Sequence, residues 1–199
     1  MSVSIPRSMK LESKLVLLRC YAPADAGVLA HALMDNADRL KDDFSARLEE
    51  AKNIQCVEMY IGRKIQQWGS ADEFRFGVWD KATLKFAGEV VLKDIAWNIP
   101  KADVGYFVVQ EFSGGGRVTD ALRLIIPFAF ETLHLRKLQI RTASSNLPSQ
   151  RVAERCAFKR EGILRNDSVK ADGITLLDLV YYGLTLDDYE EMKRKPHSI

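Results

Sequence analysis

The chain has 199 residues, a formal charge of +2 at pH 7, 47% hydrophobic residues and 28% charged residues. Such a composition is ordinary for a globular protein with a buried core, and the small net charge excludes strong attraction to nucleic acid or a membrane surface. No apolar run reaches the ~18 residues of a membrane-spanning helix, and residues 1–10 lack the apolar centre of a signal peptide. We therefore expect one domain, residues 1–199, in a cytoplasmic protein.

The first part of the chain combines a strand with helices. Residues 14–19 are largely apolar and predict a strand, and Pro23 then suits the first turn of a helix. We interpret the polar residues 36–50 as a short helix followed by a loop. A longer amphipathic helix follows, because apolar residues recur at helical spacing at Ile54, Val57, Ile61, Ile65 and Trp68.

After this helix, apolar residues recur at every second position. Phe74, Phe76 and Val78 alternate with other residues, which predicts a half-buried strand. A turn at residues 80–83 leads to a second strand at residues 86–92. We interpret residues 93–102 as a loop before a third strand.

The stretch from Asp103 to Leu133 is the centre of the sequence. It predicts a strand, Asp103–Val109, then a turn with three consecutive glycines, then an apolar helix. Glycines let the backbone approach a ligand, and a helix that starts after them aims unpaired N–H groups at the turn. This arrangement suits phosphate, although a glycine cluster alone is equally compatible with a flexible loop. Pro127 predicts a kink in the helix.

The last third of the chain adds more strands around one helix. Residues 137–142 alternate as a strand, and the polar residues before Pro148 indicate the start of a helix that continues to Cys156. Residues 158–164 and 174–184 predict two further strands. Cysteines and histidines lack the spacing of metal ligands, so we expect no metal. The whole order predicts an α+β fold, with a mixed α/β sheet and helices packed against it.

Several segments together resemble the GNAT superfamily of acyl-CoA-dependent N-acetyltransferases. The resemblance spans nearly the whole chain and is strongest to the branch with the ribosomal-protein N-terminal and spermidine acetyltransferases. It implies the GNAT acyl-CoA N-acyltransferase fold, a central mostly antiparallel sheet with helices on both faces, and acetyl-CoA as co-substrate. The segments are residues 15–19, Val104-Gly105-Tyr106, the glycine turn with Thr119-Asp120-Ala121, Asn146-x-x-Ser149, and residues 158–165.

The resemblance implies where coenzyme A binds. The family's pyrophosphate turn reads Gln or Arg, x, x, Gly, x, Gly or Ala; here Gly116 matches, while Ser113 and Val118 depart from the pattern. Arg117 either contacts a phosphate or points to water, and both alternatives stay open. The residues implied in cofactor binding are Val108, Val109, Ser113, Gly114, Gly115, Gly116, Arg117, Val118, Thr119, Asn146 and Ser149.

The resemblance also suggests catalytic residues. Ser149 matches a serine near the thioester sulfur in the ribosomal-protein branch, whereas Ala153 stands where many relatives carry a tyrosine acid. Ser149 is therefore the candidate general acid. The alternative is that it is an ordinary serine at the start of a helix. Backbone N–H groups of Val108 and Val109 are the expected donors to the thioester carbonyl. Asp103 and Glu89 are the candidate bases, and each is also compatible with a structural role.

The acceptor follows from proton chemistry. Deprotonating a lysine side chain at pH 7 costs about 4.6 kcal/mol, and an α-amino group near pKa 8 about 1.4 kcal/mol. Without an obvious strong base, we expect a protein N-terminal α-amine. The alternatives are a small amine (polyamine, amino acid or antibiotic) and a non-catalytic CoA-binding or interaction module. The segment Asp35–Ser70, where this fold shapes its acceptor site, has mixed charge. Neither nucleic acid nor membrane is an expected partner, and a homodimer is possible by analogy.

Overall fold

The computed structural model describes residues 4–194. Residues 1–3, part of the segment 1–10 that lacks a signal-peptide pattern, lie outside the described residues. Among residues 4–194, one sheet has eight strands in the order β1-β2-β3-β4-β5-β6-β8-β7. Its printed pairings are antiparallel except for the parallel pair β5–β6, which confirms the expected mixed, mostly antiparallel sheet. The strands are β1 (Lys10–Glu12), β2 (Val16–Cys20), β3 (Phe74–Asp80), β4 (Phe86–Ala96), β5 (Lys101–Val108), β6 (Lys137–Ala143), β7 (Lys159–Val169) and β8 (Leu176–Thr185).

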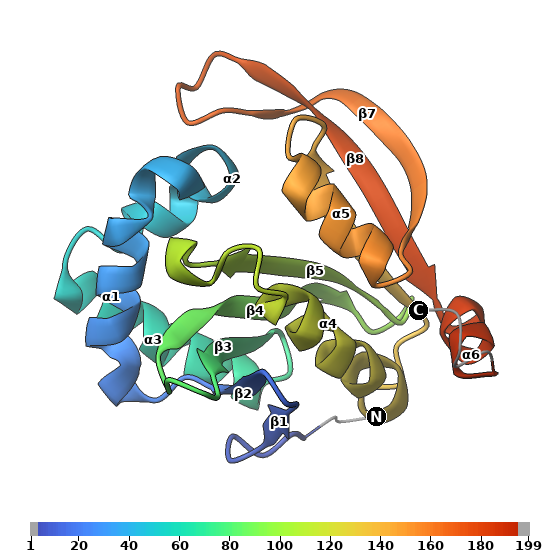
Figure 1. Cartoon of the computed structure of the whole chain (residues 1–199), viewed down its shortest axis with the longest axis horizontal. Coiled ribbons are helices and arrows are strands. Elements are labelled where there is room, and N and C mark those ends of the chain that lie inside the picture. Colours follow the sequence, from blue (N-terminus) through green and yellow to red (C-terminus); the bar gives the residue numbers. More distant parts are fainter. Residues whose placement is uncertain (1–3, 195–199) are drawn as a thin grey trace.

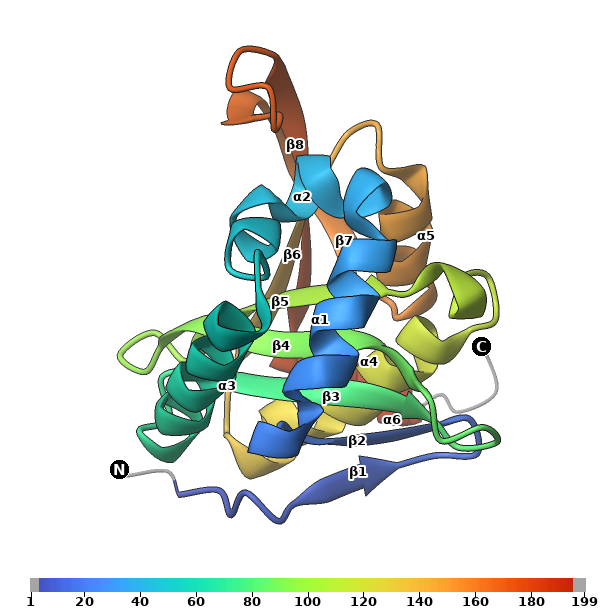
Figure 2. The ribbon, with the colours of Figure 1, turned by 90° about the vertical axis from the view of Figure 1, so that its left-hand side faces the viewer.

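Helices cover both faces of this sheet, as expected. In Figures 1 and 2, α1 and α3 lie on one face, and α4 and α5 lie on the other. The α-helices are α1 (Ala26–Asp35), α2 (Ala37–Glu49), α3 (Ile54–Gly69), α4 (Arg117–Pro127), α5 (Leu147–Arg155) and α6 (Leu186–Arg194). The two faces of the sheet are thus covered by different parts of the chain.

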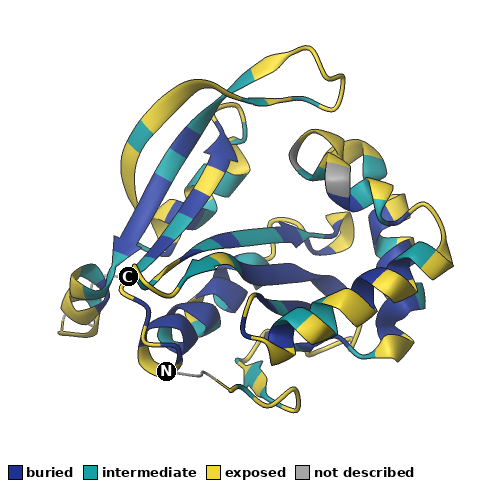
Figure 3. Cartoon of the chain, turned by 180° about the vertical axis from the view of Figure 1, so that it is seen from behind, coloured by how far each residue is buried: buried dark blue, intermediate teal, exposed yellow. Residues whose placement is uncertain are grey.

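Buried residues fill the middle of the sheet, whereas β7 and the far end of the β7–β8 hairpin are mostly exposed (Figure 3). Aromatic rings fix the packing of the helices on the central strands. The Trp68 ring in α3 meets Phe74 and Phe76 edge-on at centroid distances of 5.2 and 4.8 Å. Phe128 packs on the same two rings at 5.7 and 5.5 Å. The alternation of Phe74, Phe76 and Val78 therefore marked a true core strand.

The structure differs from the sequence-based prediction in several elements. Residues 36–50, expected as a short helix and loop, form α2 over thirteen residues. The expected loop at residues 93–102 is mostly strand, because β4 continues to Ala96 and β5 starts at Lys101. β1 and α6 were not predicted. Short or polar segments carry weak periodicity, and tertiary pairing decides their structure.

Pro127 does not lie inside a continuous α-helix. It is the last residue of α4, with helical torsions of −62° and −37°, and a π-helical turn, η3 (Phe128–Thr132), follows it. The Leu133 amide donates to the Phe128 carbonyl oxygen at 3.1 Å, five residues back. The change of helical geometry thus follows the proline.

Candidate active site

The sheet opens between β5 and β6. In the described part of the chain, these strands pair at Lys101–Asp103 against Lys137–Gln139. Beyond Asp103, β5 stays paired with β4 as far as Val108, while β6 continues along β8 to Ala143. We call this region, between residues 104–108 of β5 and 140–143 of β6, the splay. Asp103 marks its apex.

Backbone alternation determines which groups of β5 face the splay. The Val109 amide donates to the Ala87 carbonyl oxygen at 2.9 Å, so the odd-numbered residues of β5 direct their polar groups toward β4. The amides of Val104, Tyr106 and Val108 point the other way, into the splay. The expectation that the Val109 amide donates to the thioester is therefore wrong, because that amide belongs to the β-ladder.

The corner between α1 and α2 closes on the end of β5. The Asn36 Oδ1 atom accepts from the Gln110 amide at 2.7 Å, and the Arg39 guanidinium donates to the Val108 carbonyl oxygen. Gln110 opens the 3-10 turn η2 (Gln110–Phe112) that leads to the glycines. Sequence reasoning missed both contacts, since they join residues far apart in the chain.

The glycine turn has the shape expected of a phosphate cradle. Gly114 and Gly116 have φ of 75° and 79°, and Gly116 is the N-cap of α4. Ser113 and the three glycines are exposed. The amides of Ser113 and Gly115 donate within the turn, which leaves the amides at the N-terminus of α4 for a phosphate. Val118 is partly buried and packs against the core, and Thr119 is buried. This backbone fits a pyrophosphate group.

Arg117 takes neither of the two roles left open by its sequence. Its Nε and Nη2 atoms donate to the Asp80 Oδ2 atom at 3.0 and 2.9 Å, and its Nη1 atom donates to the Gly115 carbonyl oxygen at 3.0 Å. The guanidinium is therefore committed to the protein.

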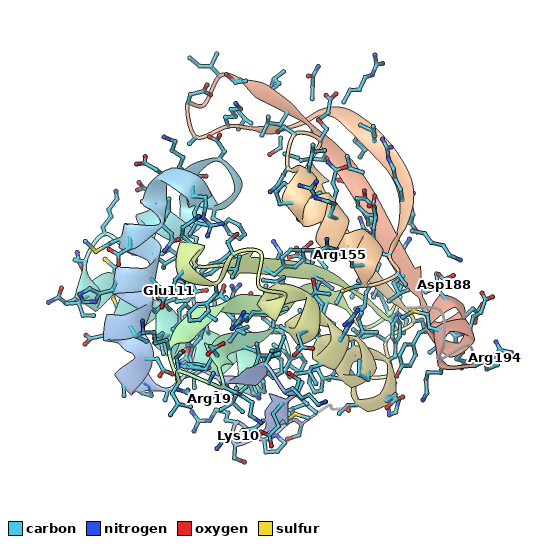
Figure 4. The ribbon with its side chains drawn as sticks, viewed as in Figure 1. Lys10, Arg19, Glu111, Arg155, Asp188 and Arg194 are labelled. Carbon is cyan, nitrogen blue, oxygen red and sulfur yellow. The ribbon has the colours of Figure 1, made fainter. Side chains whose placement is uncertain are left out.

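Ser149 lies where α5 meets β5. Its amide donates to the Asn146 Oδ1 atom at 3.1 Å, the N-cap bond of α5. The Tyr106 hydroxyl lies 3.0 Å from both the Ser149 carbonyl oxygen and the Ser149 hydroxyl, and it can donate its one hydrogen to either oxygen. Burial raises the pKa of Tyr106 above its usual value, so the phenol stays protonated and can donate. In Figure 4 the labelled Arg155 marks the far end of α5, and Glu111 marks η2.

Asp103 lies on the other face of β5 from Tyr106, because the two residues are separated by an odd number of positions. Its carboxylate pairs with Arg141 of β6 at 2.5 Å, and the side chain is 18% exposed. Arg141 also reaches Asp94, at 3.5 Å. Burial, with the nearby charge of Asp94, raises the pKa of Asp103 despite the opposing effect of Arg141. Asp103 is thus an accessible carboxylate with increased basicity.

Glu89 has a different environment. It is 3% exposed, accepts from the Tyr21 hydroxyl at 2.7 Å, and pairs with Arg47 at 3.4 Å and with Arg75. Burial opposes its charge, but Arg75 and Arg47 hold the pKa of Glu89 below its usual value. Glu89 pairs with Phe107 of β5 in the ladder. Phe107 lies four residues after Asp103, which is a distance of about 13 Å along β5. The structure does not bring the two candidate bases together.

A sheet splayed beside a glycine turn and a helix N-terminus defines an acyl-CoA-dependent N-acyltransferase. The chain belongs to the GNAT acetyltransferase family, whose acetyltransferase (GNAT) domain model matches residues 16–159. It is therefore an N-acetyltransferase with acetyl-CoA as donor. The described residues include no helix able to cross a membrane. Within residues 4–194, no three His, Cys, Asp or Glu side chains are grouped to hold a metal ion.

Known proteins support this assignment. The chain is 32% identical over 182 residues to YdaF of Bacillus subtilis, named as a ribosomal N-acetyltransferase, with 89% of this chain and 95% of YdaF covered. The structure matches ribosomal-protein-S5-alanine acetyltransferase from Vibrio fischeri with a TM-score of 0.83 at 20% identity, over 92% and 99% of the two chains. It also matches RimL, a ribosomal L7/L12 α-N-protein acetyltransferase solved with coenzyme A. That match has a TM-score of 0.82 at 17% identity, over 90% and 99%. At these identities the two structural matches show the fold.

Proposed function

We propose that this enzyme acetylates the N-terminal α-amino group of a protein, with ribosomal proteins as the substrate class. The observation that carries the proposal is Asp103, a partly exposed carboxylate of raised pKa at the apex of the splay. A single carboxylate is a weak base. It suits an α-amine, which costs about 1.4 kcal/mol to deprotonate at pH 7, better than a lysine at about 4.6 kcal/mol. The similarity to YdaF adds support.

The two faces of β5 separate the proton transfers. The amine approaches from the Asp103 face, loses a proton to that carboxylate, and attacks the thioester carbonyl so that a C–N bond forms. The C–S bond then breaks, and the Ser149 hydroxyl gives its proton to the leaving thiolate. Tyr106 turns its one hydroxyl hydrogen to the Ser149 oxygen and stabilises it until it regains a proton from water, and Asp103 releases to water the proton that it took from the amine. The amides of Tyr106 and Val108 face the splay and are the donors that β5 offers to the oxyanion.

The helices around the acceptor side argue against a polyamine. A polyamine needs unpaired acidic groups, and three acids of this region pair with neighbouring cations. Asp38 pairs with Lys41 at 3.2 Å, Glu49 with Lys52, and Glu50 with Arg63. These pairs reduce the negative charge that the segment Asp35–Ser70 offers to a polyamine, which supports a protein N-terminus as the acceptor.

The test compares three acceptors with the purified enzyme and acetyl-CoA. These are a peptide with a free N-terminus and no lysine, the same peptide N-acetylated with one internal lysine, and spermidine. We expect kcat/KM for the free N-terminus to exceed that for either other acceptor by at least about 100-fold, the scale set by the difference in deprotonation cost. Preference for the blocked lysine peptide or for spermidine would refute the proposal.

A further inference from the structure

We propose that Asp80, at the end of β3, is a positioning residue that fixes the shape of the pyrophosphate turn through Arg117. The inference concerns acetyl-CoA binding and holds whichever amine is the acceptor. Its basis is a continuous set of hydrogen bonds from the β3–β4 turn to the glycines.

Asp80 is anchored firmly in its own turn. Its side chain is 1% exposed. The Oδ1 atom accepts from the amides of Ala82 and Thr83, at 3.1 and 2.9 Å, and from the Thr83 hydroxyl at 2.9 Å. This leaves Oδ2 for Arg117, whose Nε and Nη2 atoms lie at 3.0 and 2.9 Å. The carboxylate therefore gives the guanidinium a fixed position and orientation.

Arg117 transmits this position to the turn. Its Nη1 atom donates to the Gly115 carbonyl oxygen at 3.0 Å. In a trans peptide the carbonyl and the following N–H point in opposite directions, so this bond directs the Gly116 amide away from Arg117. A Cβ atom on Gly115 would lie 2.3 Å from Nη1, so the arginine contact itself requires glycine here. The bond thus presets an amide of the cradle before acetyl-CoA binds.

Arg117 is a poor candidate for a direct phosphate contact. Swinging it toward a ligand would leave the buried Asp80 carboxylate without its cationic partner, which is strongly unfavourable. The hydrogen bonds from Arg117, against the effect of burial, hold the pKa of Asp80 below its usual value, so the pair is ionised at neutral pH. The charge of the Arg117 guanidinium is therefore balanced by Asp80, and its hydrogen-bond donors are directed at Asp80 and Gly115 rather than at a ligand.

The first experiment measures acetyl-CoA affinity by titration calorimetry for wild type, Asp80→Asn, Arg117→Gln and the double variant. We expect each single variant to raise Kd about tenfold and the double variant to match the singles, since both remove one linked interaction. The kcat at saturating acetyl-CoA should change less than about threefold, because a residue that acts only in binding does not affect the chemical step. Unchanged Kd in Asp80→Asn alongside weak binding in Arg117→Gln would instead show a direct phosphate contact, and additive losses would also overturn the proposal.

Arg117→Lys provides the sharpest control. Lysine keeps the positive charge but cannot bridge Asp80 and the Gly115 carbonyl at once. We expect it to bind acetyl-CoA as poorly as Arg117→Gln; wild-type affinity would refute positioning. Because Arg117→Lys keeps a cation beside the buried Asp80 carboxylate, this variant tests the proposal even if Asp80→Asn or Arg117→Gln fails to fold.

A shortened acetyl donor distinguishes a defect at the pyrophosphate turn from a general disturbance of the fold. S-acetylpantetheine carries the thioester but lacks the pyrophosphate, so its kcat/KM should be the same in wild type and variants. An equal fall with both donors would mean that the substitutions merely disturb the fold. Lys81→Ala is the matched control, because it removes an ion pair from the same turn to Glu12 without touching Asp80 or Arg117. It should leave Kd for acetyl-CoA unchanged.

Discussion

The hydroxyl groups of Tyr106 and Ser149 lie 3.0 Å apart and join β5 to the start of α5 beside the splay. Neither residue could position the other through local sequence, since they are 43 positions apart. This pair supplies a protonated donor next to the serine that the mechanism assigns to the leaving thiolate.

Removing the serine hydroxyl should slow the chemical step. We expect Ser149→Ala to lower kcat about 100-fold, the usual scale for loss of a general acid, with little change in Kd for acetyl-CoA. Tyr106→Phe should lower kcat about tenfold, and the double variant should resemble Ser149→Ala because the two act as one unit. Tyr182→Phe is the matched control: it removes a 3.0 Å bond from β8 to Glu154 of α5 and should leave kcat unchanged. Wild-type turnover in Ser149→Ala would exclude its role as acid.

Arg141 should set the pH at which the enzyme becomes active. Its positive charge favours the ionised form of Asp103, so Arg141→Gln should raise the pKa of that carboxyl further. Because the base must be ionised to accept a proton, the acid limb of the kcat/KM profile should move to higher pH. Asp103→Asn should lower kcat/KM about 100-fold. The exposed Arg123→Gln on α4 should leave the profile in place. If Asp103→Asn keeps full activity, another group accepts the proton.

Glu89 should matter for stability rather than for proton transfer. Glu89→Gln leaves Arg47 and Arg75 buried without their carboxylate and should cost roughly 3 kcal/mol of unfolding free energy. Its lowered pKa means that its contribution is present above the unfolded value near 4.3 and is lost as pH falls through the lower folded value. Urea unfolding of wild type and variant at pH 7 and pH 3 should therefore differ less at the lower pH. Loss of kcat in folded Glu89→Gln would return Glu89 to the candidates for base.

Ala157 should be a site of easy stabilisation. It has φ of 62° just after α5, where the Phe158 amide donates to the Ala153 carbonyl oxygen and the Ala157 amide to Glu154, each at 3.0 Å. This helix-ending motif prefers glycine, because a Cβ atom strains the left-handed conformation. We expect Ala157→Gly to raise the unfolding free energy by about 1 kcal/mol in thermal unfolding. Ala32→Gly inside α1 should lower it by a similar amount. Destabilisation by Ala157→Gly would show that the alanine methyl packs usefully.

Much of the molecule was accessible from local sequence. The alternation of Phe74 and Phe76 predicted a half-buried strand, which exists but is buried along nearly its whole length. The glycines before an apolar helix predicted a cradle at Gly114 and Gly116. The first signal is an alternation of apolar residues and the second is the set of backbone torsions that glycine allows, so both depend only on residues close together in the sequence. The extent of α2 and the continuation of β4 past Leu92 were missed, since polar residues there carry no clear period.

The sequence alone determined the fold family, the position of the glycine turn, and the short list of Ser149, Asp103 and Glu89. Only the tertiary structure showed how their environments differ. Strand register placed Asp103 at the apex of the splay and Glu89 between two arginines, and it committed the Val109 amide to the ladder. It also brought Asp80 to Arg117, 37 residues away. Burial and charge partners set what each group can do, and those partners come from strands and helices that no local pattern brings together.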